Sequence, residues 1–136
     1  PHHNVAVGVI WKKGKILITQ RPPKGLLGGL WEFPGGKLKE GETPAAAVSR
    51  EIQEELNLAV SVGDLIGVIR HAYSHFKITL HAFHCDYQRG KIQTEHPYQW
   101  VLPAELNLHA FPAANRRIID TLEKGDRLLF QKTEKK

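Results

Sequence analysis

Three glutamates in one stretch of the chain could hold a divalent cation. Glu51, Glu54 and Glu55 fall within a predicted helix that runs from Thr43 to about Asn57. At about 100° per residue, their carboxylates share an arc of ~100° on one side of that helix. Glu51 and Glu55 form a like-charge pair four residues apart, which destabilises a helix unless something offsets the repulsion. Mg²⁺ or Mn²⁺ takes such oxygen ligands and leaves positions open for phosphate, whereas a solvated acidic face balanced by a nearby arginine needs no metal.

The residues before this helix suit a phosphate ligand. Gly35 and Gly36 let the backbone approach a ligand closely, and Lys37 adds positive charge beside them. Glu42 lies one residue before the expected start of the helix, within reach of its first turn, and Arg50 lies beside the glutamates. A glycine turn that leads into an acid-bearing helix is therefore a candidate cradle for a metal-bound diphosphate, although most glycine pairs are only turns.

The helix that must position the glutamates has a defined start and end. Thr43 can act as its N-cap, with Pro44 at the first helical position, where the missing N–H costs nothing. Asn57 can end the helix in the left-handed conformation. Its apolar residues recur at helical spacing and predict one buried face. They are Ala45, Val48, Ile52 and Leu56.

Strands are predicted on both sides of this helix, and a second helix near the end of the chain. A second amphipathic pattern covers residues 113–123, with Ile118, Ile119 and Leu122 on its buried face. Strands first, one helix among them and another near the end predict an α/β (α+β) fold, with a mixed sheet sandwiched between helices. The predicted strands occupy residues 5–10, 15–20, 30–33, 60–71, 76–87 and 100–101.

Length and composition restrict the class of protein. The 136 residues predict one domain, residues 1–132, followed by a charged tail at 133–136. A net charge of +5 permits a nucleotide or nucleic-acid partner, and an ordinary solvated basic surface explains it equally well. No apolar run approaches the ~18 residues of a membrane span, so a membrane partner is not expected. The single cysteine, Cys85, excludes a disulfide framework and a cysteine-rich zinc site.

Gly36, Glu42 and residues 50–58 together resemble the Nudix box. That pattern reads Gly, five residues, Glu, seven residues, then Arg-Glu-apolar-x-Glu-Glu-x-Gly-apolar. Here residues 50–58 read Arg-Glu-Ile-Gln-Glu-Glu-Leu-Asn-Leu, so every position matches except Asn57, where glycine is usual. Asparagine tolerates positive φ, so we expect the helix end to survive. The resemblance implies a Nudix fold and Mg²⁺-dependent hydrolysis of nucleoside diphosphates linked to another group.

The resemblance also implies roles for single residues. Gly36 and the three glutamates would hold the cation, with Lys37 beside the phosphates. Arg50 would orient a glutamate through a two-bond pair. Glu95 matches roughly the place of a further acid used by some members, and an ordinary loop acid explains it as well. The residues that the resemblance implies to be catalytic are Arg50, Glu51, Glu54 and Glu55.

Two branches of the family fit the rest of the chain. In the MutT branch, which removes oxidised dGTP, Phe-Pro-Ala-Ala-Asn at residues 111–115 resembles a Phe-Pro-Pro-Ala-Asn run whose Asn amide reads the oxidised purine. Arg21, eleven residues before Glu32, falls where this branch has a base-contacting arginine. Asn115 could equally cap the last helix, and Arg21 could be a surface charge. This branch implies a stand-alone enzyme that converts 8-oxo-dGTP to the monophosphate and pyrophosphate.

The second branch is the C-terminal domain of MutY, the adenine DNA glycosylase that acts opposite 8-oxoguanine. Residues 21–34 closely resemble a run of that domain. Tyr73, Ser74 and His75 resemble its Phe-Ser-His loop, in which Ser74 would hydrogen-bond the oxidised base, with Tyr73 and His75 beside it. A plain hairpin turn explains the same three residues. Because the chain begins at Pro1 and has no methionine, we expect it to be cut from a larger protein.

The MutY branch is the interpretation we favour from the sequence. It implies two partners: duplex DNA containing 8-oxoguanine, and an N-terminal glycosylase domain in the same chain. Arg70, Lys77 and Arg89 would then contact DNA phosphates, in a bacterial cytoplasm and close to the nucleoid. With one cysteine here, an iron–sulfur cluster could lie only in the absent part of the parent. The alternatives are the MutT-like hydrolase and, more weakly, a nucleotide-binding module without catalysis.

Overall fold

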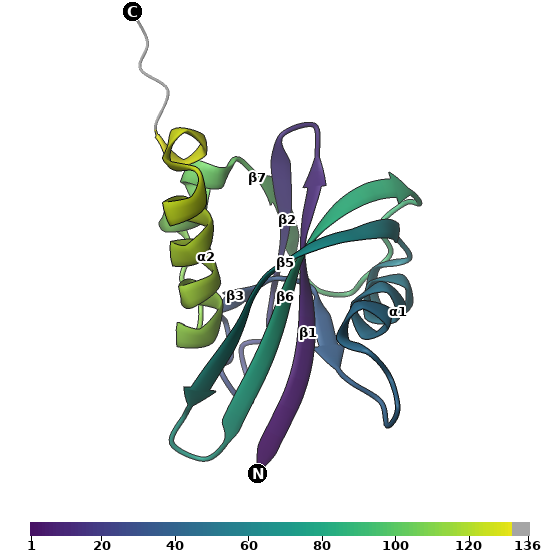
Figure 1. Ribbon diagram of the computed structural model, residues 1–136, viewed down its shortest axis with the longest axis vertical. Coiled ribbons are helices and arrows are strands. Elements are labelled where there is room, and N and C mark those ends of the chain that lie inside the picture. Colours follow the sequence, from purple (N-terminus) through teal and green to yellow (C-terminus); the bar gives the residue numbers. More distant parts are fainter. Residues whose placement is uncertain (132–136) are drawn as a thin grey trace, which may run out of the picture.

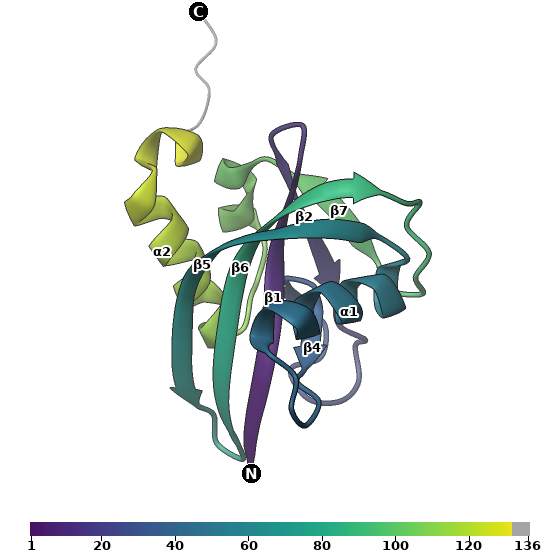
Figure 2. The same ribbon diagram turned by 45° about the vertical axis from the view of Figure 1, so that its right-hand side comes forward.

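A mixed β-sheet lies between two helices in the computed structural model, which describes residues 1–131 (Figures 1 and 2). The predicted tail at 133–136 lies outside the described residues. In chain order the elements are β1 (His2–Lys12), β2 (Lys15–Gln20), β3 (Trp31–Glu32), β4 (Gly35–Lys37), α1 (Pro44–Leu56), β5 (Ala59–Ala72), β6 (Lys77–Arg89), β7 (Tyr98–Val101), the 3₁₀ turn η1 (Pro103–Leu108), α2 (Ala113–Gly125) and the 3₁₀ turn η2 (Arg127–Phe130).

The sheet has seven strands and both pairing directions. Its main path runs β3-β2-β1-β6-β5, with β4 paired to β1 and β7 paired to β2. Only β1 and β6 run parallel among the described strands, and the other pairs are antiparallel. The predicted fold class, a mixed sheet between helices, is confirmed.

Strand β1 is the centre of the molecule because both of its faces are buried. Val7 and Val9 point to the side covered by α2, while Ala6 and Ile10 point to the side covered by α1. Figure 1 shows α2 and α1 on opposite sides of the sheet. A strand buried on both faces is apolar at nearly every position, which explains the continuous run that the sequence has there. Gly8 lies under α1, where a Cβ would crowd the core.

Helix α1 begins and ends as its sequence predicts. The Thr43 hydroxyl accepts a hydrogen bond from the Ala46 N–H at 3.2 Å, and Pro44 is the first helical residue. Asn57 closes the helix in the left-handed conformation, with φ 60° and ψ 32°. The buried face differs from the prediction by one residue, since Ala47 is fully buried and Ala45 only partly. This docking leaves the acid-bearing side of α1, which adjoins the buried face, to line the cavity beside β4.

Two short elements of the structure were not predicted from the sequence. Gly35 and Gly36, expected in a turn, belong to strand β4, which pairs with β1. A Cβ on Gly35 would overlap the Ala6 carbonyl of β1, so glycine is required for this close pairing. The turn η2 follows α2 and buries Phe130. The buried face of α2 is as predicted. No helix within residues 1–131 is both long and apolar enough to cross a membrane.

Candidate active site

One cavity of about 750 Å³ gathers most of the residues singled out in the sequence. Its walls come from β1, β3, β4, α1, the turn between β5 and β6, and the start of α2. That volume lies within the range of small-molecule sites. Of the predicted site residues, the lining includes Arg21, Gly36, Lys37, Arg50, Glu51, Glu54, Glu55, Tyr73 and Asn115.

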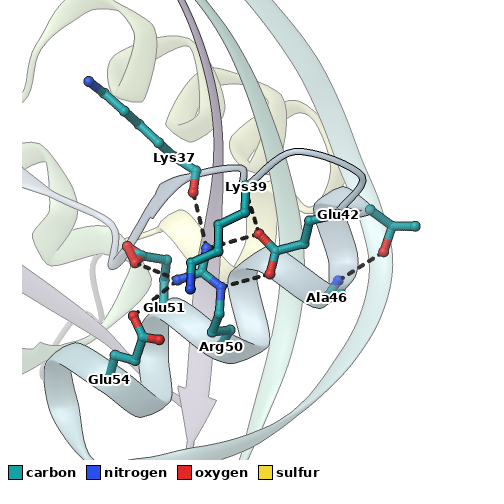
Figure 3. A network of polar contacts seen from close by, with 8 residues as sticks. Lys37, Lys39, Glu42, Ala46, Arg50, Glu51 and Glu54 are labelled. Carbon is teal, nitrogen blue, oxygen red and sulfur yellow. Dashed lines mark hydrogen bonds and ion pairs between the residues drawn. The ribbon is translucent and has the colours of Figure 1, made fainter.

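Arg50 is the hub of the acidic wall of this cavity (Figure 3). Its Nε and Nη2 donate to the two carboxylate oxygens of Glu42, at 2.7 and 2.9 Å. Its Nη1 donates to Glu51 and to Glu54, each at 3.0 Å, and Nη2 also donates to the Lys37 carbonyl at 3.1 Å. One guanidinium therefore connects α1 to β4 and to the turn between them. The sequence predicted a two-bond pair between Arg50 and a glutamate, and in the structure that glutamate is Glu42.

Glu42 is held as an anion by these contacts. Besides the two bonds from Arg50, it accepts a bond from the Lys39 N–H at 2.9 Å. The Arg50 bonds, then the Lys39 bond, lower the pKa of Glu42 to about 2. The same pairing, with Glu51 adding to it, raises the pKa of Arg50 further above its ordinary value. Glu42 therefore fixes the arginine, because its carboxylate is already fully engaged.

Glu55 has the opposite character. Burial raises its pKa to about 7, and repulsion from Glu51, Glu32 and Glu54 adds to the rise, against the weaker attraction of Arg21. Much of the residue is accessible to solvent, yet its carboxyl group faces the cavity among these other acids. Near neutral pH this carboxyl group is therefore only partly ionised, and a bound cation would favour its ionised form.

Gly36 and the glutamates of α1 fit a hard divalent cation chemically. A Cβ built on Gly36 would overlap the carboxylate of Glu51, so only glycine leaves room for that group against the β4 backbone. The available donors are carboxylate and carbonyl oxygens, which Mg²⁺ and similar ions prefer. Within residues 1–131, no three acidic, histidine or cysteine side chains converge into a ready-made metal site. Glu51 and Glu54 are directed to Arg50 instead.

Arg21 lines the cavity, and two of its three guanidinium nitrogens donate hydrogen bonds within the protein. Nη1 donates to Glu32 at 3.0 Å and Nε donates to the Leu26 carbonyl at 3.0 Å. Burial raises the pKa of Glu32, and the attraction of Arg21 opposes that rise. Sequence reasoning used Glu32 only as a landmark, and nothing in the local pattern marked it as part of this wall. Arg21 thus joins the loop after β2 to β3.

The far wall of the cavity is formed by Tyr73 and the start of α2. Asn115, 8% exposed, accepts a hydrogen bond at Oδ1 from the Phe33 N–H at 3.1 Å. The Tyr73 hydroxyl accepts one from the Ala114 N–H at 2.9 Å. Asn115 does not cap α2, whose N-cap is Pro112. An amide and a phenol therefore line the cavity opposite the acidic wall.

Three predicted residues lie elsewhere. Ser74 and His75 are exposed in the turn between β5 and β6, outside the lining of the cavity, while their neighbour Tyr73 enters it. Glu95 is exposed in the loop before β7 and is likewise outside the lining, which instead includes His96. Tyr73 is separated from Ser74 and His75 because a tight turn directs neighbouring side chains in different directions.

Comparisons with known proteins agree on one family. The model of the NUDIX domain matches residues 6–121. The chain is 36% identical to an 8-oxo-dGTP diphosphatase of Buchnera aphidicola, over 89% of this chain and 93% of that protein. It is 38% identical to a CTP pyrophosphohydrolase of Escherichia coli, over 74% of this chain and 76% of that protein. A MutT protein of Methanosarcina mazei superposes with a TM-score of 0.81 at 26% identity, covering 93% and 96% of the two chains.

These relatives correct the interpretation favoured from the sequence. The expectation of a MutY C-terminal domain is wrong, because the chain matches diphosphatases over nearly their whole length. Four further expectations depended on that interpretation, and the comparisons give no support for them: the duplex-DNA partner, the glycosylase domain in the same chain, the iron–sulfur cluster of a parent and the association with the nucleoid. The residues that suggested MutY gave too little information, since a short loop and a Trp-Glu-Phe-Pro run do not separate branches of one family. The comparisons support the MutT-like branch of the family instead.

Proposed function

The chain belongs to the Nudix family, and from this premise we propose that it is a divalent-cation-dependent nucleoside triphosphate hydrolase whose preferred substrate is 8-oxo-dGTP. The products would be the nucleoside monophosphate and pyrophosphate. One observation carries the proposal: a single cavity holds the Arg50-centred acids on one wall and the Asn115 amide on the opposite wall. Such a cavity suits a ligand with a phosphate chain at one end and a base at the other.

The acidic wall would hold the cation. Glu51, Glu54 and Glu55 would be its ligands, with Gly36 beside them. When bound, a divalent cation neutralises phosphate oxygens and lowers the pKa of the attacking water. Arg50 keeps Glu51 and Glu54 in place on α1. The positive side chain of Lys37, which also lines the cavity, would attract the phosphate chain.

The reaction needs a bond change between the α- and β-phosphates. A water oxygen forms a bond to phosphorus, the bridging P–O bond breaks, and the proton of the water passes to a basic group. Glu55 lines the cavity and would be the proton acceptor, with a bound cation lowering its pKa from the value of about 7 that it has without metal. The cavity wall formed by α1 would thus supply both charge and a proton acceptor.

The opposite wall would select the base. Oδ1 of Asn115 is oriented by the Phe33 N–H, so its NH₂ group remains to donate to a carbonyl of the base. Phe33 and Phe111 stack with ring centroids 5.6 Å apart and support this wall. Arg21, paired with Glu32, also lines the cavity, where it would contact the base or sugar. The resemblance of residues 111–115 to the MutT pattern supports the same assignment.

CTP is the second candidate substrate, because the chain resembles a CTP pyrophosphohydrolase over three quarters of that protein. The cavity is large enough for a purine or a pyrimidine nucleotide. The two substrates differ at the base and at the 2′ position of the sugar, and a comparison of their rates shows which of them the enzyme prefers. If CTP is preferred, kcat/KM for CTP exceeds that for 8-oxo-dGTP under the same conditions.

The proposal is tested by incubating the chain with 8-oxo-dGTP, dGTP or CTP, with Mg²⁺ or with a chelator. We expect pyrophosphate release at ~1–10³ per second, with kcat/KM highest for 8-oxo-dGTP. Glu54→Gln and Glu55→Gln should abolish it, while Glu40→Gln, an exposed acid outside the cavity, serves as the matched control. If none of the three nucleotides is hydrolysed, the proposal is rejected.

A further inference from the structure

Helix α2 starts without a cap of its own, although its first turn forms part of the nucleotide cavity. The first N–H groups of a helix have no partner within it and need acceptors from elsewhere. Pro112 occupies the N-cap position, and a proline side chain has no atom that can accept a hydrogen bond. The Ala114 N–H instead donates to the Tyr73 hydroxyl at 2.9 Å, from a residue 41 positions away in the sequence. Tyr73 therefore does the work of an N-cap from the turn between β5 and β6.

Tyr73 is itself held firmly. Its ring stacks on Phe76 with centroids 4.9 Å apart and 24° between the planes, and meets His71 edge-on at 4.5 Å. Its N–H donates to the Phe76 carbonyl at 2.8 Å, which closes the turn. The hydroxyl oxygen is thus a fixed point on the sheet against which α2 can be positioned.

The residue after Ala114 is Asn115, whose Oδ1 accepts from the Phe33 N–H. Two consecutive residues at the start of α2 are therefore anchored to two separate elements, β5–β6 through Tyr73 and the end of β3 through Phe33. The Phe33 bond orients the Asn115 side chain, and the Tyr73 bond fixes the backbone from which that side chain extends. Displacement of the backbone by even 1 Å would spoil the hydrogen bond from the amide to a base.

We propose that Tyr73 is a positioning residue for base recognition, which acts through Asn115 by capping α2 at Ala114. The inference rests on the proposed function, in which Asn115 contacts the base. The phenol does not need to touch the nucleotide for this role. Removal of its hydroxyl should weaken base recognition and leave the acidic wall of α1 unchanged.

The test is a double-mutant cycle on the affinity for 8-oxo-dGMP, measured by calorimetry in the absence of divalent cation. Tyr73→Phe keeps the ring and its stacking on Phe76 but removes the acceptor. A lost cap weakens binding by roughly fivefold, which corresponds to about 1 kcal/mol. Asn115→Ala should weaken binding by at least as much. If Tyr73 acts through Asn115, Tyr73→Phe should add less than twofold in the Asn115→Ala background.

Tyr87→Phe is the matched control. Its hydroxyl donates to the Gly90 carbonyl at 2.8 Å, and it lies outside the cavity lining. This variant should bind 8-oxo-dGMP as the wild type does. Fivefold losses that simply multiply in the double variant, or a Tyr73→Phe affinity equal to that of the wild type, would overturn the inference.

Hydrogen exchange supplies a readout that does not depend on any ligand. The Ala114 amide should exchange slowly in the wild type, although first-turn amides lack a helical partner. In Tyr73→Phe it should exchange at least fivefold faster, with α1 amides unchanged; equal exchange rates would overturn the capping role. Because the cycle measures binding and not hydrolysis, a protein that binds 8-oxo-dGMP without cleaving the triphosphate would reject the proposed function and keep this inference.

Discussion

Arg50 donates from Nε to one carboxylate oxygen of Glu42 at 2.7 Å and from Nη2 to the other at 2.9 Å, so the two residues form a two-bond pair across the turn before α1. The pair is largely shielded, with 20% of the Arg50 side chain and 14% of the Glu42 side chain exposed. Because Glu42 takes one edge of the guanidinium, Nη1 is left to face Glu51 and Glu54. The orientation of two candidate metal ligands therefore depends on an acid that is not itself a candidate ligand.

Arg50→Lys should lower Mg²⁺-dependent turnover by about ten- to a hundredfold, the range seen when residues that orient metal ligands are replaced. A lysine keeps the charge but cannot bond both oxygens of Glu42 and also reach Glu51 and Glu54. The measurement is kcat/KM as a function of Mg²⁺ concentration. Arg89→Lys, exposed at the end of β6, is the control and should behave as the wild type. Equal activity of the two variants would count against the hub role of Arg50.

The Glu42–Arg50 pair should be lost in acid. The folded pKa of Glu42 is about 2, below its ordinary value of 4.5, so its contribution to stability is present above about pH 4.5 and disappears as the pH falls towards 2. Glu42→Gln should therefore flatten the fall in stability between pH 5 and pH 2.5. Urea unfolding at several pH values measures this change. If the free energy of unfolding falls equally steeply between pH 5 and pH 2.5 in the wild type and in Glu42→Gln, the low pKa of Glu42 is contradicted.

Glu55 should produce the opposite trend. Its folded pKa of about 7 lies above the ordinary 4.5, so the stability it contributes is complete below about pH 4.5 and is lost as the pH rises through 7. With chelator present, Glu55→Gln should be more stable than the wild type at pH 8 and similar to it at pH 4.5. The urea midpoint at the two pH values tests this, with Glu40→Gln as control. Added Mg²⁺ should narrow the difference at pH 8, since a cation relieves the same repulsion.

Gly36→Ala should disable the acidic wall without unfolding the protein. Its Cβ would overlap the Glu51 carboxylate, which must move away from β4. We expect turnover to fall by about tenfold or more, with a far-ultraviolet spectrum like that of the wild type. Gly67→Ala in β5 is the control, because a Cβ there meets nothing within 4 Å. Full activity in Gly36→Ala would show that turnover does not require the Glu51 carboxylate to lie against Gly36.

The long elements and the acidic helix could be predicted from the sequence because their determinants are local. Thr43, Pro44 and Asn57 mark the two ends of α1, and the spacing of its apolar residues decides which side is buried. Burial of that side places Glu51, Glu54 and Glu55 together on the adjoining side of α1, where they line the cavity. Strand β4 was not predicted, and only the last two residues of β7 were, because three or four residues show no reliable periodicity.

The sequence indicated the cavity wall formed by Tyr73 and the start of α2 only through single residues. Tyr73 and Asn115 were both candidates, but the sequence assigned Tyr73 to a DNA-reading loop together with Ser74 and His75. The fold separates Tyr73 from its neighbours and joins it to Ala114. Glu32 and His96 carried no pattern of their own and enter the cavity only because β3 and the loop before β7 close on it.

The sequence alone determined the family motif, the ends and faces of α1, and the presence of three carboxylates on one side of it, because neighbouring residues on a helix have fixed relative directions. Only the tertiary structure decided which acid Arg50 pairs with, which turn residue enters the cavity and what caps α2. Those outcomes depend on contacts between segments far apart in the chain, whose geometry no local pattern encodes.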